Sequence, residues 1–162
     1  MGKGMIIIAL ILALGLLTYI FQIALNRQYN PNQTVQTRQI TDQHIEIVLK
    51  RNRAGHYVTS GKINGHRAVF LLDTGATYVA IPEQLARQIG LNIGRPITLS
   101  TANGRTTGYQ TKIAELDIGQ IRLNNIKAII TPNLDEVLLG MSVLKQLEFT
   151  QRGNELTVRQ YL

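Results

Sequence analysis

The sequence contains no cysteine. This absence excludes a disulfide framework, a thiolate zinc site, a Cys-x-x-Cys redox motif and a cysteine nucleophile. The three histidines, His44, His56 and His66, match no metal-binding spacing. The sequence also lacks the Gly-x-Ser-x-Gly motif of serine hydrolases, a phosphate-binding loop and the Gly-x-Gly-x-x-Gly motif of dinucleotide-binding proteins. We therefore expect neither a metal nor a cofactor.

Acidic residues are scarce, with 10 Asp and Glu against 17 Lys and Arg, and the formal net charge is +7. The basic residues are spread along the chain, apart from Lys50, Arg51 and Arg53, and no aromatic residues alternate with them as on a nucleic-acid-binding surface. We expect no nucleic-acid partner. A solvated basic face explains the charge best, and attraction to an anionic membrane surface is the second explanation.

Apolar residues are concentrated at the N-terminus. No charge occurs from Met5 to Phe21, and apolar residues continue to Leu25. A helix from Met5 to Leu25 would be about 31 Å long, which is enough to cross the hydrocarbon core of a bilayer. Residues 1–25 are therefore predicted to be a transmembrane anchor. A cleaved signal peptide is the alternative, although no Ala-x-Ala cleavage pattern follows the apolar stretch.

The short flank before this helix favours an N-terminus inside the cell. We therefore expect a single-pass protein of the inner (cell) membrane, with the rest of the chain on the periplasmic or extracytoplasmic side. Residues 26–43 are rich in Asn, Gln and Thr and nearly free of apolar residues, which predicts a flexible polar linker.

Residues 44–162 show the period of β-strands. Strand-like segments are expected at 44–49, 57–63, 68–72, 113–123, 126–130, 147–150 and 155–158, with a hairpin at 97–112. Turn signals occur at Asn64-Gly65, Asn103-Gly104, Asn124-Asn125 and Gly153-Asn154. Two short helices are expected, at 82–89 and 141–147. The pattern predicts a mainly β domain with two short helices.

One group of residues indicates a specific chemistry. The apolar run before Asp73 predicts a buried strand, and Asp73 is followed by Thr74 and Gly75. Carboxylates are seldom buried without compensation, so this position is unusual. A purely structural explanation is an Asx turn, in which Asp73 caps backbone N–H groups and Gly75 supplies the turn.

Phe70 to Ala76 resembles the active-site signature of aspartic proteases, and Val137 to Gly140 resembles the second hallmark of that fold. The hairpin at 97–112 lies where that family carries its flap, the β-hairpin that closes over substrate. The chain is most similar to bacterial membrane-anchored, retropepsin-like (clan AA) aspartic proteases, over about residues 45–160. The motifs that carry this resemblance are Gly55-His56-Tyr57, Asn64-Gly65, Asp73 to Thr77, Thr101 to Gly104 and Leu138 to Met141.

The resemblance implies a single-lobe retropepsin-like acid protease fold at 44–162 and endopeptidase activity on a peptide or protein substrate. That reaction needs two carboxylates that share one proton. Because the sequence has one Asp-Thr-Gly, the second carboxylate would be Asp73 of another copy, in a homodimer.

The resemblance also implies a role for each site residue. Asp73, Thr74 and Gly75 form the catalytic loop: Thr74 would lock the two loops of the dimer together, and the Gly75 N–H would hold the aspartate. In the substrate-binding region, Ala76 would keep the carboxylate accessible, and Asn103 and Gly104 would form the flap tip.

Two other interpretations stay open, because a fold does not prove an activity. One is a catalytically inactive retropepsin-like module, tethered to the membrane, that binds a peptide or partner in the flap cleft. The other is a structural or assembly protein in which Asp73 is only a turn cap.

Overall fold

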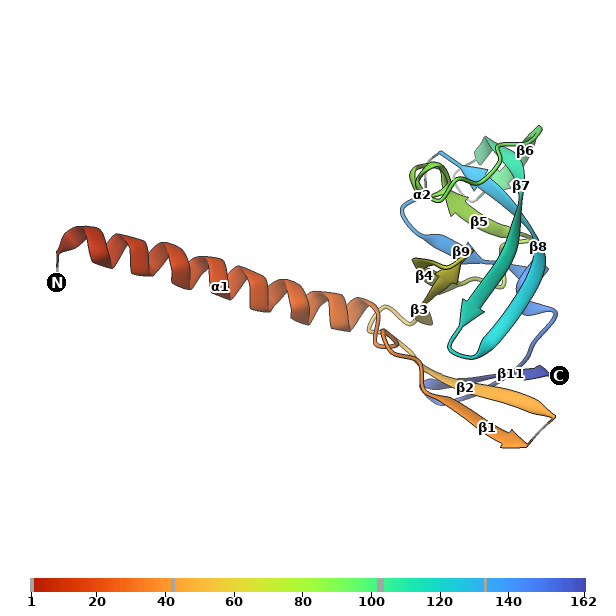
Figure 1. The fold of residues 1–162 in the computed structure, drawn as a ribbon, viewed down its shortest axis with the longest axis horizontal. Helices are drawn as coiled ribbons and strands as arrows, with labels where there is room; N and C mark the ends of the chain where they lie inside the picture. Colours follow the sequence, from red (N-terminus) through yellow and green to blue (C-terminus); the bar gives the residue numbers. More distant parts are fainter. Residues whose placement is uncertain (1, 42, 102–103, 133) are drawn as a thin grey trace.

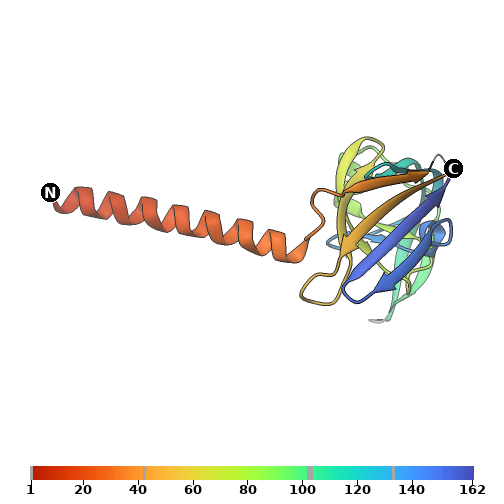
Figure 2. The ribbon, with the colours of Figure 1, turned by 90° about the horizontal axis from the view of Figure 1, so that it is seen from below.

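The structure, a computed structural model, describes residues 2–41, 43–101, 104–132 and 134–162. Its first element is α1 (Lys3–Tyr29), a helix that extends away from the rest of the protein (Figures 1 and 2). The whole of α1 is described, and none of its residues is buried. By length and composition α1 could cross a membrane, in agreement with the predicted apolar helix.

The polar segment after the apolar stretch is more ordered than the sequence suggested. We expected residues 26–43 to be a flexible linker, but α1 continues through Tyr29, and β1 (Thr37–Thr41) pairs antiparallel with β2 (His44–Lys50). Asn30 and Asn32 are each only 5% exposed. Polar composition suggested a flexible segment because polar side chains are usually exposed. An amide can nevertheless be buried in a folded domain when its hydrogen bonds are satisfied.

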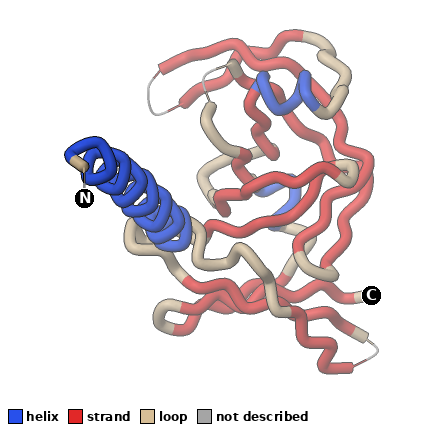
Figure 3. The backbone as a smooth tube through the Cα atoms, turned by 60° about the vertical axis from the view of Figure 1, so that its left-hand side comes forward, coloured by secondary structure: helices blue, strands red, loops and turns tan. Residues whose placement is uncertain are grey.

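The remaining elements form a mainly β domain with two short helices, as predicted (Figure 3). In chain order they are β3 (Val58–Ile63), β4 (His66–Leu72), β5 (Val79–Pro82), α2 (Glu83–Gln88), β6 (Pro96–Thr101), β7 (Gly104–Ile118), β8 (Ile121–Thr131), β9 (Val137–Leu139), α3 (Met141–Leu144), β10 (Glu148–Arg152) and β11 (Glu155–Tyr161). The helix α3 ends at Leu144, whereas the expected helix extended to residue 147.

The strands form two sheets. The larger has the order β3-β4-β9-β5-β8-β7-β6, and a further pairing of Ile63 with Leu116 joins β3 to β7 and closes the sheet on itself. The smaller has the order β1-β2-β11-β10. It lies at the end of the domain opposite to the β6–β7 hairpin (Figures 1 and 2). Apolar residues of both sheets, such as Phe70 of β4 and Ile47 of β2, belong to one core cluster.

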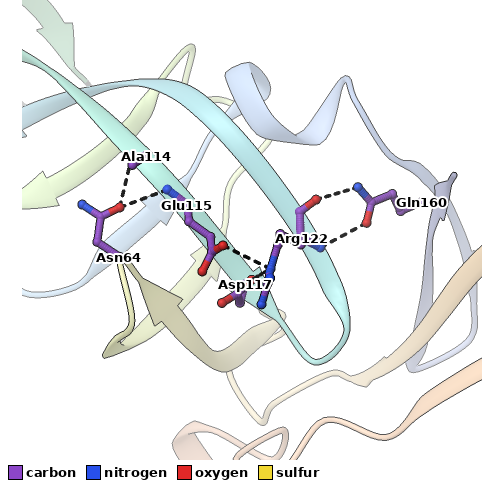
Figure 4. Close-up of polar contacts among 6 residues, drawn as sticks. All are labelled: Asn64, Ala114, Glu115, Asp117, Arg122 and Gln160. Atoms are coloured by element: carbon purple, nitrogen blue, oxygen red, sulfur yellow. Dashed lines mark hydrogen bonds and ion pairs between the residues drawn. The ribbon is translucent and has the colours of Figure 1, made fainter.

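The predicted turn at Asn64-Gly65 is present and is fastened to a neighbouring strand. Both residues have positive φ, 49° and 82°, as a two-residue hairpin turn between β3 and β4 requires. The Asn64 side-chain oxygen accepts hydrogen bonds from the backbone N–H groups of Ala114 and Glu115, each at 3.0 Å (Figure 4). One asparagine thus makes the turn and ties it to β7.

The predicted turn at Asn124-Asn125 is wrong, since both residues lie inside β8. The chain reverses instead at Gly119-Gln120, where Ile118 lies opposite Ile121. Gly119 has a φ of 60°, which favours glycine. The prediction failed because Asn-Asn is a stronger local turn signal than Gly-Gln, while the long pairing of β7 with β8 overrides it.

Candidate active site

Two parallel strands end side by side at Asp73. Leu72, the last residue of β4, lies opposite Leu139, the last residue of β9. The Asp73 N–H donates a hydrogen bond to the Leu139 carbonyl at 3.1 Å, so the pairing extends one residue beyond the strand. The apolar run before Asp73 thus forms a strand, as expected, and delivers a half-buried carboxylate to its end.

The Asp73 carboxylate is oriented by its own loop. Its Oδ1 accepts a hydrogen bond from the Gly75 N–H at 2.8 Å, and its backbone carbonyl accepts one from the Ala76 N–H at 3.3 Å. This is the geometry of an Asx turn. A Cβ atom at position 75 would approach Asp73 Oδ1 to 3.2 Å, so glycine leaves room for the carboxylate. Turn formation and an oriented carboxylate are therefore compatible.

The segment after Asp73 is hydrogen-bonded to the start of α3. The N–H of Met141 donates to the Ala76 carbonyl at 2.8 Å, and the N–H of Ser142 donates to the Thr77 carbonyl at 2.9 Å. Gly140, which precedes these two residues, is buried and packs against the same loop. The motif Val137 to Gly140 and the start of α3 thus support residues 73–77, which we call the aspartate loop.

Ser142 is a supporting residue that the sequence analysis missed. Its hydroxyl accepts a hydrogen bond from the Val79 N–H and donates one to the Lys127 carbonyl, both at 3.1 Å. It therefore links the end of the aspartate loop to β8. No sequence pattern indicated this role, since the link depends on a tertiary contact.

The aspartate loop and the β6–β7 hairpin line one cleft of about 980 Å³. Asp73, Gly75 and Ala76 line it from the loop, and Gly104, Arg105 and Thr106 line it from the hairpin. Apolar lining comes from Ala80, Leu99, Ile129, Leu134 and Leu138. A cleft of this size with a few polar groups is typical of a site for a small ligand or a peptide segment.

The cleft thus contains four of the six residues singled out in the sequence: Asp73, Gly75, Ala76 and Gly104. Thr74 is solvent-exposed and does not belong to the described lining. Asn103 lies outside the residues that the structure describes. Thr101 of β6 pairs antiparallel with Gly104 of β7, so these two strands form the predicted hairpin.

Charge is sparse in this cleft. Over the described part of the chain, Asp73 and Arg105 are the charged residues of the lining. Asp117 lies elsewhere, on β7, where it forms an ion pair with Arg122 at 2.9 Å (Figure 4). Asp135 is exposed and also lies outside this cleft. Within the described ranges, no three His, Asp or Glu side chains come together as metal ligands.

Comparisons with known proteins agree with this geometry. Residues 59–146 match the family model described as gag-polyprotein putative aspartyl protease. An uncharacterized protein in the cobV 5′ region of Sinorhizobium sp. is 38% identical over 120 residues, which cover 70% of this chain and 52% of that protein. An uncharacterized protein of Rickettsia prowazekii (strain Madrid E) is 29% identical over 120 residues, which cover 72% and 52%. The chain spans about half the length of the curated relatives it matches.

Solved structures show the same fold. The crystal structure of a retropepsin-like aspartic protease from Rickettsia conorii matches with a TM-score of 0.63 and 29% identity, over 79% of this chain and 96% of that chain. The EIAV protease complexed with the inhibitor HBY-793 matches with a TM-score of 0.50 and 17% identity, over 60% and 92%, which shows the fold alone. The predicted retropepsin-like fold is therefore confirmed.

Proposed function

Since the chain belongs to the gag-polyprotein putative aspartyl protease family, we propose that it is a membrane-anchored aspartic endopeptidase whose active site forms between two copies. One observation carries this proposal. A carboxylate, Asp73, is held at the joint end of two parallel strands and lines the same cleft as the hairpin residues Gly104 and Arg105. An aspartate that only caps a turn does not require a cleft beside it, whereas a protease requires both a carboxylate and a cleft for its substrate.

The proposed chemistry uses two carboxylates that share one proton. The ionised carboxylate takes a proton from a water molecule, and the protonated one donates a hydrogen bond to the scissile carbonyl. Two like charges in close contact do not both ionise, so the pair would hold one proton between its two carboxylates. The Gly75 N–H, bonded to Asp73 Oδ1, would keep one oxygen fixed while the carboxylate takes part in proton transfer.

A second copy would supply the second carboxylate. Within the described residues, Asp73 is the one carboxylate that lines the cleft. A two-fold axis beside the aspartate loop would bring together the two Asp73 side chains. Thr74 is exposed in the single chain, so its hydroxyl is available to the loop of a partner. Asn103 and Gly104 would close over the substrate from the flap tip.

The N-terminal helix would place this dimer at a membrane. α1 has the length and hydropathy of a membrane-spanning helix. In the proposal it crosses the inner (cell) membrane once, and the β domain lies on the periplasmic or extracytoplasmic side. Confinement of two copies to one membrane raises their effective concentration, which favours a dimer even if the domains associate weakly.

The test compares the full-length chain with its Asp73→Asn variant in lipid vesicles. Cleavage of a peptide library is measured from pH 3 to 7, with and without pepstatin. We expect cleavage by the unaltered chain, inhibition by pepstatin and no cleavage by the variant. Asp135→Asn is the matched control, since Asp135 is exposed and lies outside the cleft. Equal cleavage by the unaltered chain and the Asp73→Asn variant would contradict the proposal. Binding of peptides without cleavage would instead support the inactive binding module.

A mixing experiment tests the shared site. When equal amounts of the unaltered chain and the Asp73→Asn variant assemble at random, about a quarter of the dimers contain two aspartates. Activity per total protein should therefore fall to about a quarter, rather than to the half expected if each copy acts alone. Activity proportional to the fraction of unaltered chain in the mixture would exclude the shared site.

A further inference from the structure

The end of α1 is fastened directly to the β domain. The loop at 51–56 lies against the last turn of the helix, where the Asn52 side chain donates to the Tyr29 carbonyl at 3.0 Å. The Arg53 guanidinium donates to the Gln28 side-chain oxygen at 3.2 Å. On another side of the helix end, the Tyr29 hydroxyl donates to the Glu136 carboxylate. The last helical turn is therefore part of the surface of the domain.

The short connector between α1 and β1, residues 30–36, is held in place by hydrogen bonds of two asparagines. The Asn32 amide group donates to the carbonyls of Lys50 and Val58, at 2.9 and 2.7 Å, and its oxygen accepts the Lys50 N–H at 2.7 Å. The Asn30 side chain donates to the Ser60 hydroxyl at 2.9 Å. Both asparagines are nearly fully buried. The connector is consequently held between β2 and β3.

This attachment fixes how far the domain lies from a bilayer that α1 crosses. If the apolar stretch that ends at Leu25 fills the hydrocarbon core, Tyr29 is about 6 Å further along the helix axis. The headgroup region on each side of the core is about 5–7 Å thick. Arg27 and Gln28 then lie among the headgroups, and Arg53, which bonds Gln28, must lie there as well.

The surface around the helix end offers several exposed cations. Arg27, Lys50, Arg51, Arg53 and Arg152 are exposed, and none forms an ion pair with another described residue. The loop that follows β2 and the turn between β10 and β11 both lie on the side of the domain toward α1 (Figure 2).

Three carboxylates neighbour this surface, and they do not cancel its charge. Glu136 accepts the Tyr29 hydroxyl, Asp135 precedes it, and Glu155 lies opposite Lys50. Against the five cations they leave a net positive charge. The chain end at Leu162 is on the far side of the domain from α1 (Figures 1 and 2). The loop after β2 and the β10–β11 turn, which carry or adjoin four of the cations, therefore lie on the side from which the helix leaves.

We propose that Arg27, Arg51 and Arg53 form a membrane-contact surface that binds the anionic headgroups of phospholipids in the bilayer crossed by α1. This inference rests on the proposed transmembrane placement of α1. Arginine suits the partner, because its guanidinium donates several hydrogen bonds to phosphate oxygens. Contact at this surface, together with the rigid connector, holds the domain at one height and one tilt above the membrane. The consequence is that substrates reach the cleft from one fixed direction.

The test uses the full-length chain in lipid nanodiscs and a fluorescent label on a single introduced cysteine, which the absence of native cysteine allows. Ala54→Cys places the label in the 51–56 loop, and Leu162→Cys is the control on the far side. Quenching by a headgroup-attached nitroxide is measured in phosphatidylcholine discs with and without phosphatidylglycerol. We expect strong quenching at position 54 and little at position 162. Quenching at position 54 should be substantial in both kinds of disc, because the connector holds the loop at the bilayer. It should increase further with the anionic lipid and fall back to the phosphatidylcholine value at high salt, since salt screens exposed charges.

The variant Arg51→Gln/Arg53→Gln should lose most of the increase caused by the anionic lipid. Arg95→Gln/Lys112→Gln removes the same charge from exposed residues elsewhere and should retain it. Equal quenching at position 54 in both kinds of disc, or no effect of the first double variant, would overturn the proposal. Peptide cleavage in the same discs separates the two hypotheses, because retained cleavage without lipid-dependent quenching contradicts the membrane contact alone. A chain that does not enter the discs contradicts the transmembrane placement on which both depend.

Discussion

Gly140 packs so closely under the aspartate loop that a Cβ atom on it would lie 2.6 Å from the carbonyl oxygen of Ala76. The carbonyl oxygen of Tyr78 would be closer still. Both obstacles are backbone atoms, and the Ala76 carbonyl is held in place by the Met141 N–H at 2.8 Å. The φ of Gly140 is −87°, which any residue adopts, so glycine is needed here for space rather than for conformation.

The Gly140→Ala variant should therefore be strongly destabilised. We expect the free energy of unfolding of the β domain to decrease by about 3 kcal/mol, since overpacking against fixed atoms displaces the backbone. Urea denaturation measures the change. Gly15→Ala is the control, because Gly15 lies in α1 with no atom near its absent side chain. A Gly140→Ala variant as stable as this control would contradict the close packing.

Removal of the Asn32 side chain should loosen the connector between α1 and the domain. The Asn32→Ala variant leaves two backbone carbonyls and one backbone N–H without their partner, in a buried position. Loss of such bonds costs about 1–3 kcal/mol in the free energy of unfolding. Urea denaturation should show this loss for Asn32→Ala and little change for Gln33→Ala, since Gln33 is exposed. Equal stabilities would show that the bonds to Asn32 do not hold the connector.

The stability of the C-terminal strand should depend on acidity. The Tyr161 hydroxyl donates to the Glu148 carboxylate at 2.6 Å, and the Arg159 guanidinium donates to it at 3.0 Å. The hydrogen bond from Tyr161, and then the charge of Arg159, lower the pKa of Glu148 below its ordinary value. A carboxyl group whose pKa is lower in the folded state stabilises that state above its unfolded pKa. This stabilisation is lost as the pH falls through the folded pKa.

The measurement is the free energy of unfolding of the unaltered chain and of Glu148→Gln at several pH values. At pH 6 the unaltered chain should be the more stable. The difference should shrink as the pH falls below about 4, where the glutamate takes up a proton. Glu155→Gln is the control, since Glu155 forms no ion pair with any described residue. A difference that stays constant from pH 6 to pH 3 would refute the role of the ionised carboxylate.

Arg105 should influence which peptides are cleaved, if the proposed activity is correct. Apart from Asp73 it is the charged residue of the described cleft lining, and it is exposed. A substrate carboxylate near the flap would be attracted to its guanidinium. An exposed pair of this kind contributes up to about 1 kcal/mol, which corresponds to roughly fivefold in relative cleavage rate. Arg105→Gln should therefore reduce the preference for peptides with Asp or Glu by about that factor.

A peptide library read out by mass spectrometry measures this preference. Arg95→Gln is the matched control, because Arg95 is exposed but lies outside the described lining. The same ranking of peptides with Arg105 and with Gln at this position would exclude the electrostatic selection.

Local signals in the sequence predicted some parts of the fold well. Asn64-Gly65 forms the expected turn because its geometry is set by the two residues themselves. The strand before Asp73 and the hairpin at 97–112 were also indicated by short patterns. That the hairpin and Asp73 share a cleft came from family resemblance, since no local pattern fixes how distant segments meet.

Other parts depend on tertiary contacts that a single sequence does not reveal. The burial of Asn32 depends on backbone groups of β2 and β3, which lie far away in sequence. The short strands β5 and β9 are positioned by their neighbours, because three or four residues carry too little periodicity. Asn125 has the left-handed φ of 57° that is typical of a turn, yet it lies inside β8. A turn-like conformation at one residue therefore did not mean that the chain reverses there.

The long strand β7 connects the β6–β7 hairpin to the opposite end of the domain. Its inner part, from Tyr109 to Ile118, is paired with β8, whereas its outer part, from Gly104, is paired with β6 alone. Beyond Ile118 the turn is held by a hydrogen bond of 3.2 Å from the Gln120 N–H to the Thr37 hydroxyl. The Gln160 side chain also bonds both backbone groups of Arg122, at 3.1 and 2.7 Å (Figure 4).

This arrangement divides β7 into an inner part that β8 holds in place and an outer part that can bend. Bending should concentrate near Gly108, where the supporting strand β8 ends and a residue without a side chain lies beneath Leu99. The amide hydrogens outward of Gly108 should accordingly exchange with solvent faster than those between Tyr109 and Ile118. The contacts of the far turn with Thr37 and Gln160 thus hold the inner part of β7 in place, so that movement is confined to the β6–β7 hairpin over the cleft.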